Sequence, residues 1–327
     1  MNSEEQLISQ IFGIHKNFNK VASLVQEFQY QNNPVYRQWC DLMNFKFQIS
    51  DFKFKSAFLP ISFFKSHKVV STLFDAESVF ESSGTTTTIN SKHFVKDISV
   101  YEESFLKAFE LFYGDVKDWC IIGLLPSYLE RNNSSLVKMV DELIKRSNHN
   151  YSGFYLYNFS ELADRLLQLQ SAKQKTLVIG VTFALLDFAE QFPISIPDIT
   201  IMETGGMKGR REEMTRSEVH TFLCKQFNIA AVHSEYGMTE LLAQAYSKGN
   251  GLFVCPPWMK VLVRNEEDPL QITESGKGVL NVIDLANIYS CSFIATDDVG
   301  IVYEDGTFEV KGRLDNSDLR GCSLMVV

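Results

Sequence analysis

The sequence predicts an α/β fold, in which a sheet of buried strands is covered by helices and is followed by a smaller β-rich lobe. Short apolar runs lie at Trp119–Leu125, Thr176–Gly180 and Ile199–Met202, and fully buried strands of a parallel sheet have this composition. The chain has 327 residues, of which 45% are hydrophobic, so it is able to bury a large core. After about residue 250 the pattern changes to short β-rich runs, which indicates the second lobe.

The first segment of the chain is expected to be helical. From Glu4 to about Gln38, apolar residues recur at steps of three and four, which predicts amphipathic helix. The stretch 45–64 is rich in Phe and partly alternating. It predicts short strands that lead to a turn at Pro60.

A helix is expected after each of the buried strands. The segments with helix-like patterns that follow them are Ser134–Ile144, Phe183–Ala189 and Ser217–Phe227. The helix that contains Val181–Phe188 has a second interpretation as a wall of an acyl pocket, although a buried helix is the ordinary one.

The β-rich lobe is predicted from short runs separated by turn residues. These runs are Met259–Val263, Gly278–Asp284, Gly300–Tyr303 and Thr307–Val310. We expect one core over residues 1–327, α/β over about 1–250 and β-rich over about 251–327.

The charge of the chain weighs against nucleic acid as a partner. Its net charge is −9 and its pI about 5.3, whereas phosphate backbones select basic stripes. The one dense basic run, Lys208–Arg211, is followed at once by Glu212 and Glu213.

The cysteines and the apolar runs indicate a cytoplasmic protein. No CxxC pair or metal-ligand spacing joins Cys40, Cys120, Cys224, Cys255, Cys291 and Cys322, so neither a disulfide framework nor a zinc site is expected. No apolar run approaches the roughly 20 residues that a membrane span needs. The acidic start of the chain lacks the apolar segment of a signal peptide.

The first segment with chemical content is Glu81–Thr88, Glu-Ser-Ser-Gly followed by four Thr. Small hydroxyl residues around a glycine form a loop whose backbone N–H groups and hydroxyls can wrap a polyphosphate. It is not a Walker A loop, which ends in Gly-Lys-Ser/Thr. The structural alternative is a solvated Ser/Thr turn.

The second segment is His233–Glu240, His-Ser-Glu-Tyr-Gly-Met-Thr-Glu. An aromatic ring beside a glycine can stack on a base, a hydroxyl can contact a phosphate, and a carboxylate can hold Mg²⁺. The structural alternative is a strand that turns at Gly237 into a helix, with Glu240 in its first turn. His233 is either a substrate contact or a structural histidine at a strand end.

The third segment combines Thr296–Gly300 with Lys311–Asp315. Carboxylates after a strand can accept hydrogen bonds from ribose hydroxyls, and a following Arg can serve the sugar or phosphate. The structural alternative is a β-turn with a surface ion pair.

In their order along the chain, these segments resemble the motifs of the adenylate-forming superfamily of acyl-CoA synthetases, luciferases and peptide-synthetase adenylation domains. The matching pieces are Ser-Ser-Gly-Thr-Thr, Tyr-Gly-Met-Thr-Glu, Thr-x-Asp and Gly-Arg-x-Asp. Within it, the chain is most similar to the acyl-protein synthetase (LuxE-type) branch. That likeness rests on Leu59-Pro60, Phe64-Lys65, the run Glu203–Arg210 and the run Leu319–Cys322.

The resemblance implies the large N-terminal-type adenylate-forming domain without the C-terminal lid domain. It also implies ATP and Mg²⁺ as cofactors and a nucleotide site. The β- and γ-phosphates would be bound by Ser82, Ser83, Gly84, Thr85 and Thr86. Gly205 and Gly206 would lie along the adenine, with Tyr236 stacked on it beside Gly237.

The same resemblance implies the catalytic groups. Thr239 would contact the α-phosphate, Glu240 would hold Mg²⁺, and Asp298, supported by Arg313, would hold the ribose hydroxyls. In most members a lid lysine aims at the α-phosphate; here we expect Lys208 to compensate for it.

The resemblance further implies activation of a carboxylic acid, foremost a fatty acid, to an acyl-adenylate, followed by transfer of the acyl group to a thiol. Cys322 is the expected acceptor within this chain, with an apolar residue of a last strand as its structural alternative. A partner acyl reductase or carrier protein would then take the acyl group. A lidless acyl-CoA ligase remains an alternative. A nucleotide-binding regulatory protein without turnover is another, and it is favoured by the altered loop, in which Thr87 replaces a family glycine.

Overall fold

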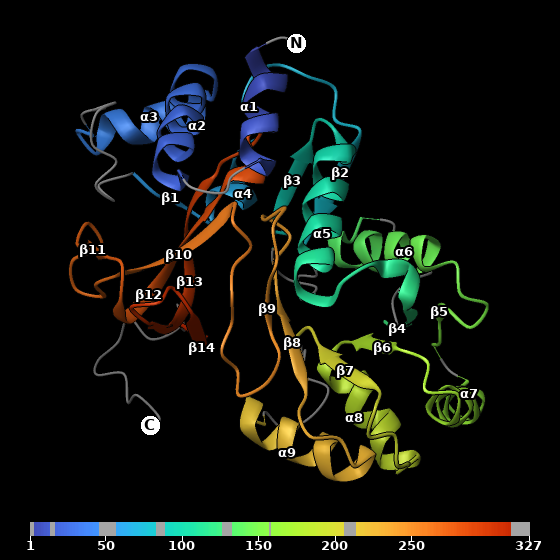
Figure 1. Ribbon diagram of the computed structural model, residues 1–327. Helices are drawn as coiled ribbons and strands as arrows, with labels where there is room; N and C mark the ends of the chain where they lie inside the picture. Colours follow the sequence, from blue (N-terminus) through green and yellow to red (C-terminus); the bar gives the residue numbers. More distant parts are fainter. Residues whose placement is uncertain are drawn as a thin grey trace.

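The computed structural model describes residues 3–13, 17–45, 57–82, 89–125, 133–156, 158–205 and 214–314 (Figure 1). Two six-stranded sheets and a two-stranded hairpin organise this part of the chain, with helices packed around them. The predicted α/β class is confirmed. Within the described ranges, no helix has both the length and the apolar content required to cross a membrane.

The first sheet contains the buried strands predicted from the sequence. Its order is β5-β4-β6-β7-β8-β9, and all neighbours are parallel except β8 and β9. The strands are β4 (Cys120–Leu124), β5 (Gly153–Phe154), β6 (Thr176–Gly180), β7 (Thr200–Glu203), β8 (His233–Tyr236) and β9 (Ala245–Ser247). The strands expected near residues 120, 176 and 200 are therefore confirmed as β4, β6 and β7.

Helices cover both faces of this sheet because its strands are apolar on both sides. Ile121 and Ile179 belong to one core cluster, with α5 (Ile98–Tyr113) and α6 (Ser135–Ser147). Ile122 and Val178 belong to the other, whose helices are α7 (Phe159–Ser171), α8 (Thr182–Gln191) and α9 (Arg216–Phe227). Helices α6, α8 and α9 were predicted, whereas α5 and α7 were not.

The second sheet has the order β1-β13-β12-β10-β11, and β14 pairs with β13. Its strands are β1 (Leu59–Pro60), β10 (Met259–Arg264), β11 (Ile272–Thr273), β12 (Gly276–Asp284), β13 (Phe293–Val302) and β14 (Phe308–Arg313). Strand β1 comes from the N-terminal part and pairs parallel with β13, with Leu59 opposite Ile294. Short 3₁₀ turns lie at η1 (Val116–Asp118) and η2 (Leu285–Asn287).

The N-terminal helical segment divides into α1 (Ser3–Phe12), α2 (Phe18–Asn32) and α3 (Pro34–Leu42). Asn33 separates the last two, since its side chain accepts a hydrogen bond from the Tyr36 N–H (3.0 Å) and Pro34 occupies the first turn of α3. Helix α4 (Phe63–Ser66) follows a turn at Ile61 and Ser62, directly after Pro60. The strands expected between residues 46 and 56 lie outside the described residues.

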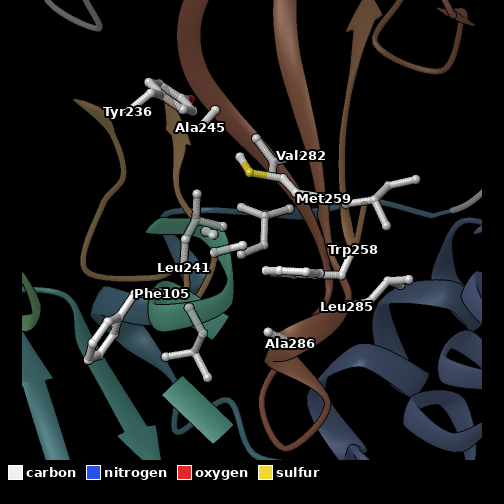
Figure 2. Packing of buried hydrophobic residues seen from close by; sticks show 14 of the residues in the cluster. Phe105, Tyr236, Leu241, Ala245, Trp258, Met259, Val282, Leu285 and Ala286 are labelled. Atoms are coloured by element: carbon white, nitrogen blue, oxygen red, sulfur yellow. The ribbon is translucent and has the colours of Figure 1, made fainter. Parts of the chain in front are cut away.

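The segment after β8 is anchored in a large apolar cluster that joins helix α5 to the second sheet. Leu241, Trp258 and Leu285 belong to it and are drawn together in Figure 2. Trp258 also donates its indole N–H to the Ser104 hydroxyl (2.9 Å) on α5. The residue that follows Glu240 is thus held by the core.

Strand β8 carries a buried carboxyl group on one of its faces. His233 and Glu235 point to one side and Ser234 and Tyr236 to the other, because side chains alternate along a strand. A Cβ atom at Gly237 would lie 2.3 Å from Glu235 Oε1, so a larger residue there would displace the Glu235 carboxyl. Burial raises the pKa of Glu235 to about 8, and the negative charge of Glu203 on β7 adds to the shift.

We predict that Glu235→Gln stabilises the fold at alkaline pH. The folded chain holds the Glu235 proton more tightly than the unfolded chain, so the wild-type free energy of unfolding falls as the pH rises from about 4 to about 8. The glutamine variant lacks this loss and should be more stable by on the order of 3 kcal/mol near pH 8, but not near pH 4.

Urea unfolding at both pH values measures the difference. Glu110→Gln on α5, where the side chain is exposed, is the matched control and should follow the wild type. Parallel pH profiles for the wild type and Glu235→Gln would contradict a protonated Glu235.

Candidate active site

Tyr236, Asp298 and Arg313 form a connected set where β8 meets β13 and β14. The Tyr236 hydroxyl donates to Asp298 Oδ2 (2.7 Å), and Arg313 Nε donates to Asp298 Oδ1 (2.9 Å). Antiparallel pairing places Asp298 directly opposite Arg313. Asp298 is 5% exposed, so the buried carboxylate has a hydrogen-bond donor on each oxygen.

The Tyr236 ring lies in an aromatic group. Its centroid is 5.3 Å from that of Phe308, edge-on, and 5.9 Å from that of Phe253. The ring is therefore fixed from the second sheet, and it remains a prediction that a base stacks on it.

Glu240 lies in a turn after β8, not in a helix, so the helical alternative is wrong. The Glu240 carbonyl accepts from Asn287 Nδ2 (2.7 Å), and the Leu242 and Ala243 N–H groups donate to Asp284 Oδ2 (2.7 and 2.9 Å). A helix would pair these backbone groups internally, whereas here side chains from β12 and η2 take them.

The Glu240 carboxyl is itself buried, with 6% exposure. Burial raises the pKa of Glu240, while hydrogen bonds from the Ser91 hydroxyl and the Glu240 backbone N–H, together with the charges of Arg313 and Lys65, oppose the shift. In the described part of the chain, no Lys or Arg lies within ion-pairing distance of this carboxylate. Within those described ranges it is a buried oxygen donor that forms no ion pair.

The hairpin that flanks the predicted phosphate loop contacts Glu240. Strands β2 (Ser78–Glu81) and β3 (Lys92–Val95) form an antiparallel hairpin. At its base the Ser91 N–H donates to Ser82 Oγ (2.9 Å) and the Ser82 N–H donates to the Ser91 carbonyl (3.1 Å). Because the Ser91 hydroxyl also contacts Glu240, the hairpin and the turn after β8 meet at one point.

A second buried cluster holds the turn at Gly205. Glu203 Oε2 accepts from the Gly205 N–H (2.6 Å), and Glu203 Oε1 lies 3.3 Å from Arg216 Nε and 3.6 Å from His220 Nε2. Burial alone would raise the pKa of Glu203, but the contacts with His220, Arg216, Ser234 and Gly205 lower it to about 2. Gly205 has φ +71°, a left-handed conformation that favours glycine.

Arg216 extends this cluster to the second sheet. Its Nη1 donates to the Val310 carbonyl (3.0 Å) in β14, and its guanidinium lies 5.2 Å from the centre of the Phe253 ring. The Gly205 turn and the strand that carries Arg313 are therefore tied together by one side chain.

The structure places about half of the predicted site residues. Those in the described ranges are Ser82, Gly205, Tyr236, Gly237, Thr239, Glu240, Asp298 and Arg313. Those outside the described residues are Ser83, Gly84, Thr85, Thr86, Gly206, Lys208 and Cys322. Ser82 and Glu240 meet through Ser91, and Tyr236 and Arg313 meet through Asp298.

Sequence reasoning missed Glu203, Arg216 and Asp284 as parts of the site. Glu203 carried a usable signal, since it ends a buried parallel strand two residues before a glycine pair, at the edge where ligands approach such sheets. His220 contacts Glu203 (3.6 Å) and the Ser234 hydroxyl (3.4 Å). His233 contacts the Tyr113 hydroxyl (3.1 Å).

Comparison with solved structures agrees with this architecture. The chain superposes on a 2-hydroxyisobutyryl-CoA ligase with a TM-score of 0.64 and 11% identity, over 94% of this chain and 69% of the ligase. It also superposes on a luciferase-like enzyme from the mealworm Zophobas morio with a TM-score of 0.52 and 14% identity, over 75% of this chain. The match spans 60% of the mealworm enzyme. At these identities the likeness concerns the fold, that of the large N-terminal domain of adenylate-forming enzymes.

Comparison of sequences is more specific. Two proteins described as long-chain-fatty-acid–luciferin-component ligases, from Vibrio harveyi and Aliivibrio fischeri, are each 24% identical to this chain, over 91% of this chain and 84% of their own length. Residues 14–327 match the family of LuxE acyl-protein synthetases. The chain belongs to the LuxE acyl-protein synthetase family, within the adenylate-forming ligases.

Proposed function

We propose that this protein uses ATP to convert a carboxylic acid, foremost a fatty acid, to an acyl-adenylate and then transfers the acyl group to a thiol. The observation that carries the proposal is the meeting of three segments around Glu240 and Asp298. The hairpin base reaches Glu240 through Ser91, and Tyr236 and Arg313 converge on Asp298.

Each segment has a role in binding ATP under this proposal. The Asp298 oxygens accept hydrogen bonds from the ribose hydroxyls, and the bond from Arg313 orients the carboxylate. Ser82 to Thr86 surround the β- and γ-phosphates, and the turn at Gly205 and Gly206 lies along the adenine beside Tyr236 and Gly237.

Glu240 suits a magnesium ion that is held mainly by phosphate oxygens. Its carboxylate is buried, and among the described residues it has no ion-pair partner and no group of three or more His, Cys, Asp or Glu is arranged to hold a metal. Mg²⁺ in nucleotide sites commonly takes one or two carboxylates plus substrate phosphates. Bound there, the ion would neutralise charge on the phosphates.

The chemistry needs placement more than a protein nucleophile. An oxygen of the substrate carboxylate forms a bond to the α-phosphorus while the bond to pyrophosphate breaks. A thiolate sulfur then bonds to the acyl carbon, and AMP leaves. Thr239 and Lys208 would face the α-phosphate, where fixed donors and positive charge stabilise the transition state.

The described cysteines are poorly suited to be the thiol acceptor. Burial raises the pKa of Cys40 to about 12, of Cys120 to about 11 and of Cys255 to about 12, and it also raises the pKa of Cys224 and Cys291. A thiol in such surroundings supplies little thiolate. This supports Cys322 as the acceptor within the chain, from which a reductase or carrier protein would take the acyl group.

We predict that Asp298→Asn weakens ATP binding. Loss of the charged acceptor should raise the KM for ATP about tenfold, since a hydrogen bond to a charged group contributes roughly 1.5–3 kcal/mol. Carboxylate-dependent ATP–pyrophosphate exchange with short, long and aromatic acids measures this KM.

Asp297→Asn is the matched control, because Asp297 precedes Asp298 on β13 and points to the opposite face. Equal KM values in the two variants would contradict the ribose role of Asp298. No exchange with any acid would contradict the proposed function.

We predict that Cys322 carries the acyl group. Incubation with ATP and a radiolabelled fatty acid should label the protein, hydroxylamine should release the label, and Cys322→Ser should abolish labelling while ATP–pyrophosphate exchange persists. Cys255→Ser is the control and should label normally, because Cys255 is half-buried with a raised pKa. Label that appears only on added coenzyme A would instead identify an acyl-CoA ligase.

A further inference from the structure

His93 joins the hairpin of β2 and β3, which flanks the predicted phosphate loop, to the turn that carries Thr239 and Glu240. It lies on β3 with 1% exposure, and its Nδ1 is 2.9 Å from the Thr239 carbonyl oxygen. Phe64 and Phe80 enclose the ring edge-on, with centroids at 5.8 and 6.5 Å. The contact is thus a single directed hydrogen bond inside an apolar enclosure.

The chemistry of this contact fixes the state of the ring. A carbonyl oxygen only accepts hydrogen bonds, so Nδ1 must carry the proton. Burial lowers the pKa of His93 to about 4, and therefore the imidazole is neutral at physiological pH. The ring is a fixed donor, and it is not placed to exchange protons during a reaction.

Ser91 directly precedes β3, two residues before His93, and both residues are buried. The Ser91 hydroxyl contacts the Glu240 carboxylate, while His93 holds the backbone of the preceding residue, Thr239. Ser91 also closes the base of the hairpin through its N–H bond to Ser82 Oγ (2.9 Å). Two buried residues at the start of β3 therefore determine where two neighbouring groups of the turn lie relative to the hairpin base.

We propose that His93 is a positioning residue that holds Thr239 and Glu240 in register with the base of the hairpin, so that Glu240 is correctly placed to bind the metal of a metal–nucleotide. This inference rests on the proposed function. It assigns the role to the Nδ1–H donor and not to the volume of the ring.

Two substitutions separate the donor from the volume. In His93→Asn the amide nitrogen takes the place of Nδ1, so the bond to the Thr239 carbonyl is kept although the side chain is much smaller. In His93→Gln the amide extends to the place of Nε2, so the volume is better kept but the donor is misplaced. A packing role predicts that Asn is the more damaging change, whereas a positioning role predicts that Gln is.

Two readouts that do not depend on turnover test the proposal. Hydrogen–deuterium exchange of the nucleotide-free protein reports on the peptide that spans Tyr236–Ala243, and electron paramagnetic resonance reports Mn²⁺ binding with α,β-methylene-ATP. We expect His93→Gln to exchange faster in this peptide and to weaken Mn²⁺ binding about five- to tenfold, with His93→Asn within about twofold of the wild type.

The outcomes are distinct from those that test the proposed function. If the wild type binds the nucleotide and Mn²⁺ but the two variants are equal, or Asn is the weaker, the positioning role of His93 is overturned and the proposed function stands. If the wild type binds neither nucleotide nor metal and catalyses no exchange, the proposed function fails, and the role assigned to His93 fails with it.

Discussion

Asp284, wholly buried at the end of β12, fixes the turn on which the site depends. Its carboxylate accepts hydrogen bonds from the N–H groups of Leu242 (2.7 Å), Ala243 (2.9 Å) and Ala286 (3.0 Å). Burial raises the pKa of Asp284 to about 6, and these amides oppose the shift, so the group is ionised at neutral pH. Two backbone N–H groups of the turn thus find their acceptor in one side chain of the second sheet.

The second sheet holds the backbone N–H groups of the turn, whereas the Thr239 carbonyl and the Glu240 carboxyl contact the hairpin. Ser91 and Thr239 come from segments about 150 residues apart, and each contact between hairpin and turn joins a side chain to a backbone or carboxylate group. On the other side, Arg216 connects the Gly205 turn to β14. Both sheets therefore position the same small set of groups, and neither would do so alone.

The sequence predicted what depends on local pattern. Strands such as β6 are apolar on both faces, and the N-terminus of α9 carries a capping box at Thr215. Helix α5 was missed although Asp97 caps it by accepting from the Ser99 N–H. In the site, Tyr236 and Asp298 stood out because each lies in a recognisable motif. His93 and Asp284 have no such motif, since their partners are backbone groups distant in the chain and only the folded structure brings them together.

The carboxyl groups around the site have different hydrogen-bond and ion-pair partners, and Glu240 has the fewest of them among the described residues. Asp298 and Glu203 each lie beside an arginine, and Asp284 is solvated by backbone N–H groups. Glu235 keeps its proton at neutral pH, since its pKa is about 8. Among the described residues, Glu240 has only a serine hydroxyl and its own N–H as near donors. Ionising a buried carboxyl with so few donors is costly. Under the proposed function, a cation brought with the phosphates of a nucleotide would lower this cost at Glu240, and its neighbours need no such cation.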